Sequence, residues 1–351
     1  MQYTIFGESH GPAIGVVLQD VPSGIPVDEA FIASELARRA TGKNALSTAR
    51  KEKDLVEFLS GVFEGRTTGT PLCMMIRNGD QHSGDYAAIR DLARPGHADL
   101  TGFVRYGGCN DYRGGGHFSG RLTAPLVAAG AIAKLILREE GVTAAAHIAA
   151  IGGIQDDDIN LARPDMEALT ACGQKDFPVL SDAAGAQMQE LILQCRQQQD
   201  SIGGVIECVV AGLPVGLGAP DFDRNAETLF ARQLFAIPAI KGLEFGDGFA
   251  LSEMRGSQAN DPWRMEGDRP VTATNHNGGI LGGITTGMPV VFRVAVKPTP
   301  SIAQSQETID MKTRRETTIQ TTGRHDPCIV HRAVPVVEAA AALAAVELMK
   351  L

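Results

Sequence analysis

Two stretches of the chain, residues 122–138 and 336–350, are predicted to be helices. Each helix would be apolar on almost every side. A helix that is apolar all round is buried on every side, so we expect this pair to form the centre of the molecule. Proline fits the first turn of a helix, and we expect Pro125 and Pro335 to open the two helices. Sheets laid against this centre are predicted from the strand-like runs 14–19, 56–59, 72–76, 205–210 and 290–296.

The chain also repeats itself loosely. TTGTP at 67–71 and TTGMP at 285–289 each precede a strand-like apolar run. RLTAP at 121–125 and RAVP at 332–335 each open an alanine-rich helix. Self-similarity of this kind is typical of a duplicated unit. We therefore expect one domain over residues 1–351, built from two similar units that surround the helical centre. The expected boundaries are about 1–140 and 200–351 for the halves, with 141–199 as a connector.

Composition excludes some classes of function. The formal net charge is −9, whereas binding to nucleic acids or membrane surfaces generally needs a basic excess. An anionic ligand must then be held by locally clustered arginines. The N-terminus shows no signal-peptide pattern, the longest apolar run is too short to span a bilayer, and the six cysteines show no C-x-x-C pairing. We expect a cytoplasmic protein with reduced thiols and with neither nucleic acid nor membrane as a partner.

Four short strings combine glycine with residues that bind anions or move protons. They are GESHG at 7–11, RPGHAD at 94–99, DYRGGG at 111–116 and GRHDP at 323–327. Glycine lets a ligand approach the backbone closely, arginine binds anions, and histidine exchanges protons near neutral pH. Together the strings predict one composite site for a multiply anionic ligand.

Two histidines are candidates for proton transfer. His10 lies in a glycine-flanked turn beside Ser9, and His97 follows Arg94 closely. Each is either a general acid or an ordinary turn histidine. The presence of both favours a role in proton transfer. Asp326 is a candidate for proton transfer, although an Arg-Asp structural pair is the usual explanation for such a neighbourhood. No H-E-x-x-H or C-x-x-C spacing occurs, so we expect no metal site.

Other residues are candidates for anion binding. GGGHFSGR at 114–121 is a weak dinucleotide fingerprint but suits a phosphate cradle with Arg121, the alternative being a flexible loop. Arg39 lies on the inner face of a helix that Asp28 is expected to cap, the alternative being a solvated helix end. Lys297 opens a loop that two prolines stiffen, KPTPS.

The strings together resemble those of the chorismate synthase family. GESHG, RPGHAD, DYRGGG, DSIGG, GLEFGDGF, NHNGGILGGI, KPTPSI and GRHDPC occur in the family's order, from Ile5 through the C-terminal helix. The resemblance implies an α+β fold, a β-α-β sandwich with two antiparallel sheets around a helical core, and a homotetramer. It also implies a lyase of the shikimate pathway. That enzyme converts 5-enolpyruvylshikimate 3-phosphate to chorismate and phosphate by a 1,4-anti elimination that needs reduced FMN without net redox change.

The resemblance also implies roles for residues. His10 would protonate the departing phosphate, and His97 would stabilise the reduced flavin near N1. Ser9 and Asp326 would form a relay that helps flavin N5 accept the proton lost from the ring carbon. The substrate anions would be held by Arg39, Arg94, Arg121 and Arg324. The flavin contacts would be His117, Phe118, Ser119, Pro238, Ala239, Gly278, Lys297, Pro298, Thr299, Pro300, Ser301 and Arg324.

Some positions depart from the family's pattern. Ala45 stands where many members have an arginine, and His117 and Phe118 stand where members continue the glycine run with arginine and serine. Pro238 replaces a common asparagine. These changes predict altered flavin-binding and phosphate-binding loops. Two other functions stay open, an NADPH-dependent flavin reductase and a non-catalytic anion-binding protein, and the flavin could be reduced by a separate reductase or by the protein's own use of NADPH.

Overall fold

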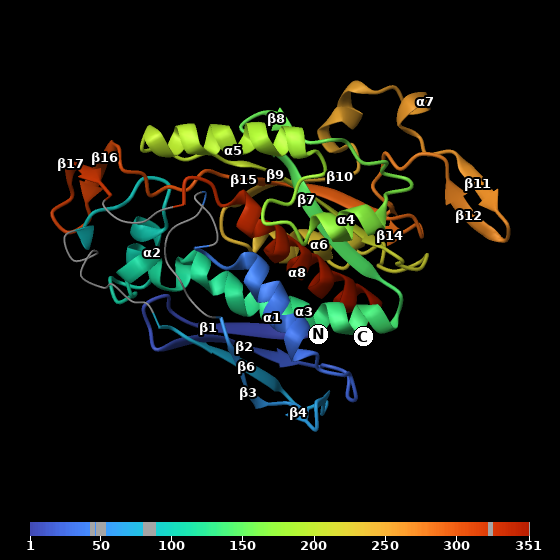
Figure 1. Ribbon diagram of the computed structural model, residues 1–351, viewed down its shortest axis with the longest axis horizontal. Coiled ribbons are helices and arrows are strands. Elements are labelled where there is room, and N and C mark those ends of the chain that lie inside the picture. The colour runs from blue at the N-terminus through green and yellow to red at the C-terminus, as the bar shows by residue number, and fades with distance from the viewer. Residues whose placement is uncertain (43–45, 47–53, 80–88, 322–325, 351) are drawn as a thin grey trace.

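The computed structural model describes residues 1–42, 46, 54–79, 89–321 and 326–350 (Figure 1). Its α-helices are α1 (Glu29–Arg39), α2 (Asp99–Arg105), α3 (Thr123–Glu139), α4 (Met166–Cys172), α5 (Asp182–Gln197), α6 (Ala226–Phe235), α7 (Gly256–Ala259) and α8 (Val330–Met349). Short 3₁₀ segments cover Arg113–Phe118, Gly120–Leu122 and Gly248–Glu253. The longer strands are β1 (Gln2–Gly7), β2 (Ala13–Gln19), β3 (Val56–Ser60), β6 (Leu72–Arg77), β7 (Thr143–Ile151), β9 (Gly204–Ala211), β10 (Ile240–Phe245), β15 (Val290–Val296), β16 (Ser305–Asp310) and β17 (Arg315–Gln320). The shorter strands are β4 (Val62–Phe63), β5 (Arg66–Thr67), β8 (Ile154–Gln155), β11 (Trp263–Glu266), β12 (Arg269–Thr272), β13 (Ile280–Leu281) and β14 (Ile284–Thr285).

Two antiparallel sheets enclose a layer of helices. The first sheet has the strand order β1-β2-β6-β3, and the second has the order β10-β15-β9-β7-β8. Figure 1 shows the first sheet below α3 and the second sheet above it, with α8 between them. The predicted α+β sandwich is confirmed. So is each expected strand, now seen as β2, β3, β6, β9 and β15.

Helices α3 and α8 form the centre, as their composition predicts. Nearly all their side chains are buried, and the two helices pack on each other. A Cβ atom added to Gly130 would lie 2.2 Å from the Cβ atom of Ala339, so the helices can approach this closely only because position 130 has no side chain. Helix α3 also packs on β2 and β6, and α8 packs on β7 and β9. The helix pair therefore joins the two sheets.

The prediction that Pro335 lies in the first turn of its helix is wrong. Helix α8 begins at Val330, so Pro335 lies inside it. Proline has no N–H group, and the intrahelical bond from position 335 to the carbonyl of His331 is therefore not made. Val330 and Val334 are fully buried, and we attribute the additional helical turn to this burial. Pro125 does lie in the first turn of α3, as predicted.

The two TTGxP strings make matching hydrogen bonds. Thr67 Oγ1 donates to the carbonyl oxygen of Pro22 at 2.6 Å and accepts from the amide three residues after that proline at 3.0 Å. Thr285 Oγ1 makes the same pair of bonds, with Pro214 at 2.7 Å and with the amide three residues later at 2.9 Å. Both threonines are buried. The same buried contact thus recurs in the two small hairpins β4-β5 and β13-β14, which supports a duplicated unit.

Strand order supports the duplication as well. The orders β1-β2-β6-β3 and β7-β9-β15-β10 correspond, with α1 between β2 and β3 in the chain and α6 between β9 and β10. We infer that β7 is the first strand of the second unit, although it lies within the 141–199 stretch expected as a connector. On this view β8, α4 and α5 are an insertion between β7 and β9. The boundaries at 1–140 and 200–351 stay a prediction.

One helical segment within the described residues is long and apolar enough to cross a membrane. It covers Gly120–Glu139, and 89% of its apolar window is buried inside the protein. Packing against α8 and the first sheet accounts for its apolar composition.

Replacing Gly130 by alanine tests the packing of the two central helices. We expect Gly130→Ala to lower the free energy of unfolding by about 1–3 kcal/mol, the usual cost of overpacking a core. Gly256→Ala is the control, because a Cβ atom at Gly256 meets nothing within 4 Å, and it should change the stability by less than about 0.5 kcal/mol. Denaturant unfolding measures both, and equal stability of the two variants would contradict the account.

Candidate active site

Ser9 and His10 lie in the turn between β1 and β2, and both are buried, at 1% and 5% exposed. The hydroxyl oxygen of Ser9 lies 3.1 Å from Nδ1 of His10 and 3.2 Å from the carbonyl oxygen of Gly114. A Cβ atom added to Gly114 would lie 2.2 Å from Cε1 of His10. The GESHG and DYRGGG strings therefore meet here, with the imidazole lying directly against the glycine backbone.

His97 approaches the same glycine run from the RPGHAD string. Its Nδ1 lies 2.7 Å from Oδ1 of Asp99, so Nδ1 is the donor, and Nε2 lies 3.4 Å from Nη2 of Arg94. A Cβ atom added to Gly115 would lie 3.0 Å from Nε2 of His97. Burial raises the pKa of Asp99, but hydrogen bonds from Arg94 and His97 outweigh it and hold this pKa well below its usual range. Asp99 is therefore an ionised acceptor that fixes the orientation of His97.

The glycine run adopts a backbone conformation that other residues rarely adopt. Gly114, Gly115 and Gly116 have φ angles of 59°, 85° and 53°, all in the left-handed region. A side chain at position 114 would collide with His10, and one at position 115 would press on His97. The absence of side chains is what allows the two histidines to lie along one stretch of backbone.

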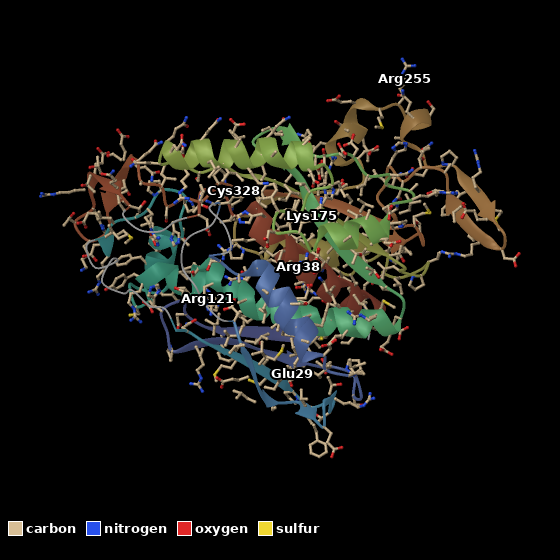
Figure 2. The ribbon with its side chains drawn as sticks, viewed as in Figure 1. Glu29, Arg38, Arg121, Lys175, Arg255 and Cys328 are labelled. Atoms are coloured by element: carbon tan, nitrogen blue, oxygen red, sulfur yellow. The ribbon has the colours of Figure 1, made fainter. Side chains whose placement is uncertain are left out.

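Arg39 and Arg121 are buried beside the N-terminal end of α3, where Figure 2 labels Arg121. Nε of Arg39 donates to Thr123 Oγ1 at 3.0 Å, and Nε of Arg121 donates to Asn78 Oδ1 at 3.2 Å. The Nη1 atoms of both arginines contact the carboxylate of Asp54. Two guanidinium groups at a helix N-terminus create a positive potential that suits an anion.

Arg94 is held by groups of the protein itself. Its Nε and Nη2 donate to the carboxylate of Asp99 at 2.7 and 2.8 Å, and its Nη1 donates to Ser301 Oγ at 3.2 Å. Nearby, Nζ of Lys297 donates to the carbonyl oxygen of Gly96 at 3.0 Å. These bonds join the RPGHAD string to the KPTPS loop. The contacts of Arg94 are therefore those of a residue that positions two loops.

Lys297 also links the KPTPS loop to the start of β10. Its backbone amide donates to the carbonyl oxygen of Ala239 at 2.9 Å. Ala239 has a φ of 75°, a conformation that is costly for a residue with a side chain. Burial and the nearby charge of Lys241 lower the pKa of Lys297. The structure thus brings together Ala239, Lys297 and Ser301, three of the expected flavin contacts.

Asp326 is buried and pairs with Arg332 near the start of α8. Nε of Arg332 in turn donates to the carbonyl oxygen of Arg39 at 3.1 Å. The pair ties α8 to the end of α1, and it leaves the expected role of Asp326 in proton transfer a prediction. Arg324 and Ala45, also named from the sequence, lie outside the described residues.

A family model described as chorismate synthase matches residues 1–349. The chain belongs to the chorismate synthase family. A curated chorismate synthase from Dehalococcoides mccartyi is 48% identical over 345 residues, which covers 96% of this chain and 92% of the relative. Another from Methanocella arvoryzae is 48% identical over 349 residues, with 99% and 91% covered.

A solved crystal structure of chorismate synthase matches the fold with a TM-score of 0.79 and 29% identity, covering 99% of this chain and 91% of the other. The resemblance read from the motif strings is therefore confirmed, and with it the assignment of the chain as a lyase. Chorismate synthases use a flavin and act on a small phosphorylated substrate. A site with two histidines and several buried arginines is consistent with such a substrate.

Gly278, an expected flavin contact of the chorismate synthase site, lies apart from the others. Its carbonyl oxygen accepts a hydrogen bond from the amide of Val291 at the start of β15, whereas Lys297 follows the end of that strand. The strand has 7 residues, which span roughly 20 Å at about 3.3 Å each. Two loops that flank one strand lie at its opposite ends, so within one chain Gly278 does not join the group around Lys297.

The residues after the glycine run make three different contacts. His117 is exposed, and its Nδ1 lies 2.9 Å from a backbone carbonyl at the end of β1. The ring of Phe118 packs near that of Tyr106, with 6.3 Å between centroids. Ser119 Oγ accepts from the amide of Arg121 at 3.3 Å and so caps the turn that leads into α3. None of these contacts tests the expected role of the three residues in flavin binding.

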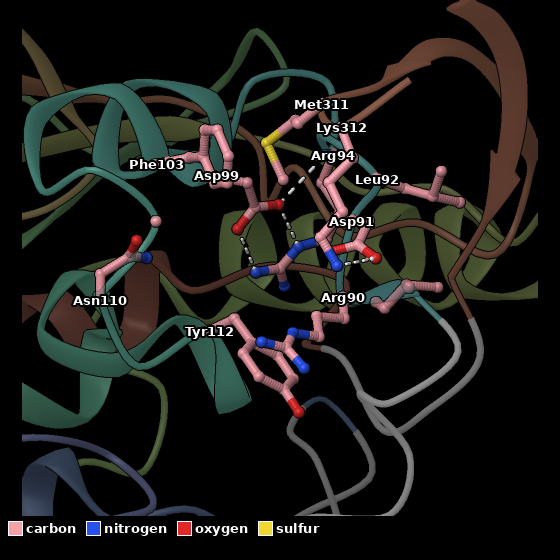
Figure 3. A pocket seen from close by; sticks show the side chains of 12 residues that line it. Arg90, Asp91, Leu92, Arg94, Asp99, Phe103, Asn110, Tyr112, Met311 and Lys312 are labelled. Carbon is pink, nitrogen blue, oxygen red and sulfur yellow. Dashed lines mark hydrogen bonds and ion pairs between the residues drawn. The ribbon is translucent and has the colours of Figure 1, made fainter. Parts of the chain in front are cut away.

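A small pocket of about 70 Å³ lies against Arg94 and Asp99, as Figure 3 shows. Arg90 and Tyr112 line the pocket, and the guanidinium of Arg90 lies over the Tyr112 ring, 5.1 Å from its centroid. This is a cation–π arrangement. The pocket extends the chorismate synthase site toward the connection between β16 and β17.

In the part of the chain that the structure describes, no group of three or more His, Cys, Asp or Glu side chains could hold a metal ion.

Three polar residues of the site escaped sequence reasoning. Asp99 ends the RPGHAD string, and its place close after Arg94 and His97 was a usable signal. Asp54 and Asn78 belong to none of the strings. They reach Arg121 only through the fold, Asn78 from the end of β6 and Asp54 from just before β3.

Gly114→Ala tests whether the bare backbone positions His10. The added Cβ atom would displace the imidazole, and a displacement of about 1 Å can cost roughly 10²-fold in turnover. Gly107→Ala is the matched control, because Gly107 has nearly the same φ, 58°, and nothing lies within 4 Å of an added Cβ. Steady-state kinetics should show a large loss in turnover for Gly114→Ala alone. Equal losses would mean that backbone strain, and not contact with His10, is responsible.

Proposed function

We propose that this chain catalyses the chorismate synthase reaction, the 1,4-anti elimination of phosphate from 5-enolpyruvylshikimate 3-phosphate to give chorismate. The reaction requires reduced FMN, leaves it reduced, and is the last common step of aromatic amino acid biosynthesis. The observation that carries the proposal is the approach of His10 and His97 to the Gly114–Gly115 backbone, beside two buried arginines. Whole-chain membership of the family supports it.

Anion binding is the first task of the site. The substrate carries a phosphate and two carboxylates, so it needs several cationic partners within a protein whose net charge is −9. Arg39 and Arg121 provide two of them at the N-terminal end of α3, where the helix dipole adds to the attraction. Arg324 is proposed as a further partner. Arg94 is proposed to act mainly by positioning His97 and the KPTPS loop, because its guanidinium already binds Asp99 and Ser301.

Proton transfer to the leaving group is assigned to His10. Its imidazole is buried in contact with Ser9 and the glycine run, so it is shielded from bulk water and held in one orientation. Protonation of the departing phosphate by a positioned histidine is ordinary general acid catalysis. Ser9 is proposed to orient His10, and with Asp326 to relay the proton that leaves the ring carbon.

The described residues suit a bound FMN. Lys297 and Ser301 supply a cation and a hydroxyl on a loop that Pro298 and Pro300 stiffen, and Thr299 adds a second hydroxyl. Reduced FMN, when bound, supplies an electron-rich ring and a nitrogen that can take up a proton. His97, with its Nδ1 proton held by Asp99, is proposed to place Nε2 toward this ring. Ala239 is proposed to line the same place.

The proposal extends to the cell and to the assembly. We propose a cytoplasmic homotetramer whose flavin is reduced by a separate reductase or by its own use of NADPH. The comparisons lend no support to a flavin reductase or to a non-catalytic anion-binding protein. Ala45, His117, Phe118 and Pro238 are proposed to alter flavin and phosphate affinity and not the proton-transfer steps.

Anaerobic turnover with purified protein tests the proposal. Chorismate and phosphate should form in equal amounts when reduced FMN is present, and FMN should remain reduced. His10→Ala should lower turnover by about 10²–10⁴-fold, the usual span for a lost general acid. His10→Asn, which keeps a polar side chain without a titratable proton, should be similarly slow. Equal turnover without flavin, or a near-normal rate in both His10 variants, would contradict the proposal.

A further inference from the structure

One carboxylate bridges the two buried arginines of the proposed anion site. Nη1 of Arg39 lies 3.2 Å from Oδ2 of Asp54, and Nη1 of Arg121 contacts Oδ1 of the same side chain. The three side chains are almost completely buried, at 6%, 3% and 4% exposed for Arg39, Asp54 and Arg121. Each oxygen of one carboxylate thus contacts a different guanidinium, which is also how a substrate phosphate or carboxylate would bind the pair.

Both arginines have other anchors on rigid elements. Nε of Arg39 donates to Thr123 at the start of α3, and its Nη2 donates to the carbonyl oxygen of Gly120 at 3.0 Å. Nε of Arg121 donates to Asn78, which itself donates to the carbonyl oxygen of Gly11 at 2.8 Å. These bonds fix both guanidinium groups without help from Asp54. The carboxylate is therefore not required to place the arginines.

Charge explains why a carboxylate lies here. Two buried guanidinium groups without a counter-ion would repel each other and would be costly to desolvate. Asp54 reduces their summed charge from +2 to +1. A bound phosphate or carboxylate would compensate the same charge, and it would be repelled by an Asp54 carboxylate that kept its place on the two guanidinium groups.

We propose that Asp54 is a built-in substitute for the substrate's anion, which compensates Arg39 and Arg121 in the empty enzyme and is displaced when substrate binds. This inference rests on the proposed function, because it takes Arg39 and Arg121 as substrate ligands. Substrate affinity then depends on the difference between two interactions of the arginines, one with the substrate's anion and one with the Asp54 carboxylate. Asp54 lowers this affinity and compensates the buried charge of the two arginines in the empty site.

Asp54→Asn tests the proposal because asparagine keeps the shape and removes the charge. The probes are inorganic phosphate and malonate, titrated by calorimetry into the purified protein at constant ionic strength. At least one of them should bind Asp54→Asn about tenfold or more tightly than wild type, the equivalent of one charge-assisted hydrogen bond. The anion that gains affinity identifies phosphate or carboxylate as the group held here. Unchanged or weaker binding of both anions would overturn the proposal.

Two matched variants separate this proposal from the proposed function. Glu57→Gln removes a nearby acidic charge that pairs with Arg77 on the surface, and it should leave anion affinity unchanged. Adding Arg39→Ala to Asp54→Asn should abolish the gain. If Arg39→Ala and Arg121→Ala in the wild-type background leave anion binding unaltered, the assignment of the arginines fails. If they weaken binding while Asp54→Asn does not strengthen it, only the substitute role of Asp54 fails.

A crystal structure of the wild-type protein with phosphate gives a second test, which holds even where Asp54→Asn does not fold. Phosphate oxygens should lie within hydrogen-bond distance of Nη1 of both Arg39 and Arg121, and the Asp54 carboxylate should have left both atoms. Phosphate bound elsewhere, or bound here with both Asp54 contacts intact, would overturn the proposal.

Discussion

The close packing of α3 on α8 is the contact on which the rest of the structure depends. Gly130 allows the approach to Ala339, and the paired helices then carry a sheet on each side. Helix α1 packs across both. This places Arg39, at the end of α1, against Thr123 at the start of α3 and against Arg332 in the first turn of α8. The proposed anion site is therefore a product of helix packing as much as of its loops.

Carboxylates inside the site explain how an acidic protein can hold a multiply anionic ligand. The net charge of −9 predicted that cationic groups would have to cluster locally, and the structure shows them clustered and paired. Asp99 binds Arg94 and orients His97, while Asp54 bridges Arg39 to Arg121, which lies just before α3. Asp99 thus sets the position of Arg94 and His97, and Asp54 sets the effective charge of the arginines that are proposed to meet the substrate.

Sequence patterns predicted the elements whose burial is visible in their composition, such as the apolar helices and the valine-rich β15. They missed β7, because a run of alanines resembles a connector until its partner β9 is known. The GESHG and RPGHAD strings predicted that His10 and His97 belong to one site, since both combine a histidine with a backbone open to close approach. Asp54 could not be predicted, because its contacts depend on where β3 lies relative to α3, which no local pattern expresses.

The central claim is that His10 and His97 serve one reaction centre along a shared stretch of glycine backbone. The most direct test is the anaerobic turnover of His10→Ala and His97→Ala, alone and combined. When two residues act as a unit, the fold loss in turnover of the double variant is smaller than the product of the fold losses of the single variants. The account predicts that the double variant is only slightly slower than the slower single variant. A loss equal to the product of the two single losses would show that the histidines act independently and would contradict it.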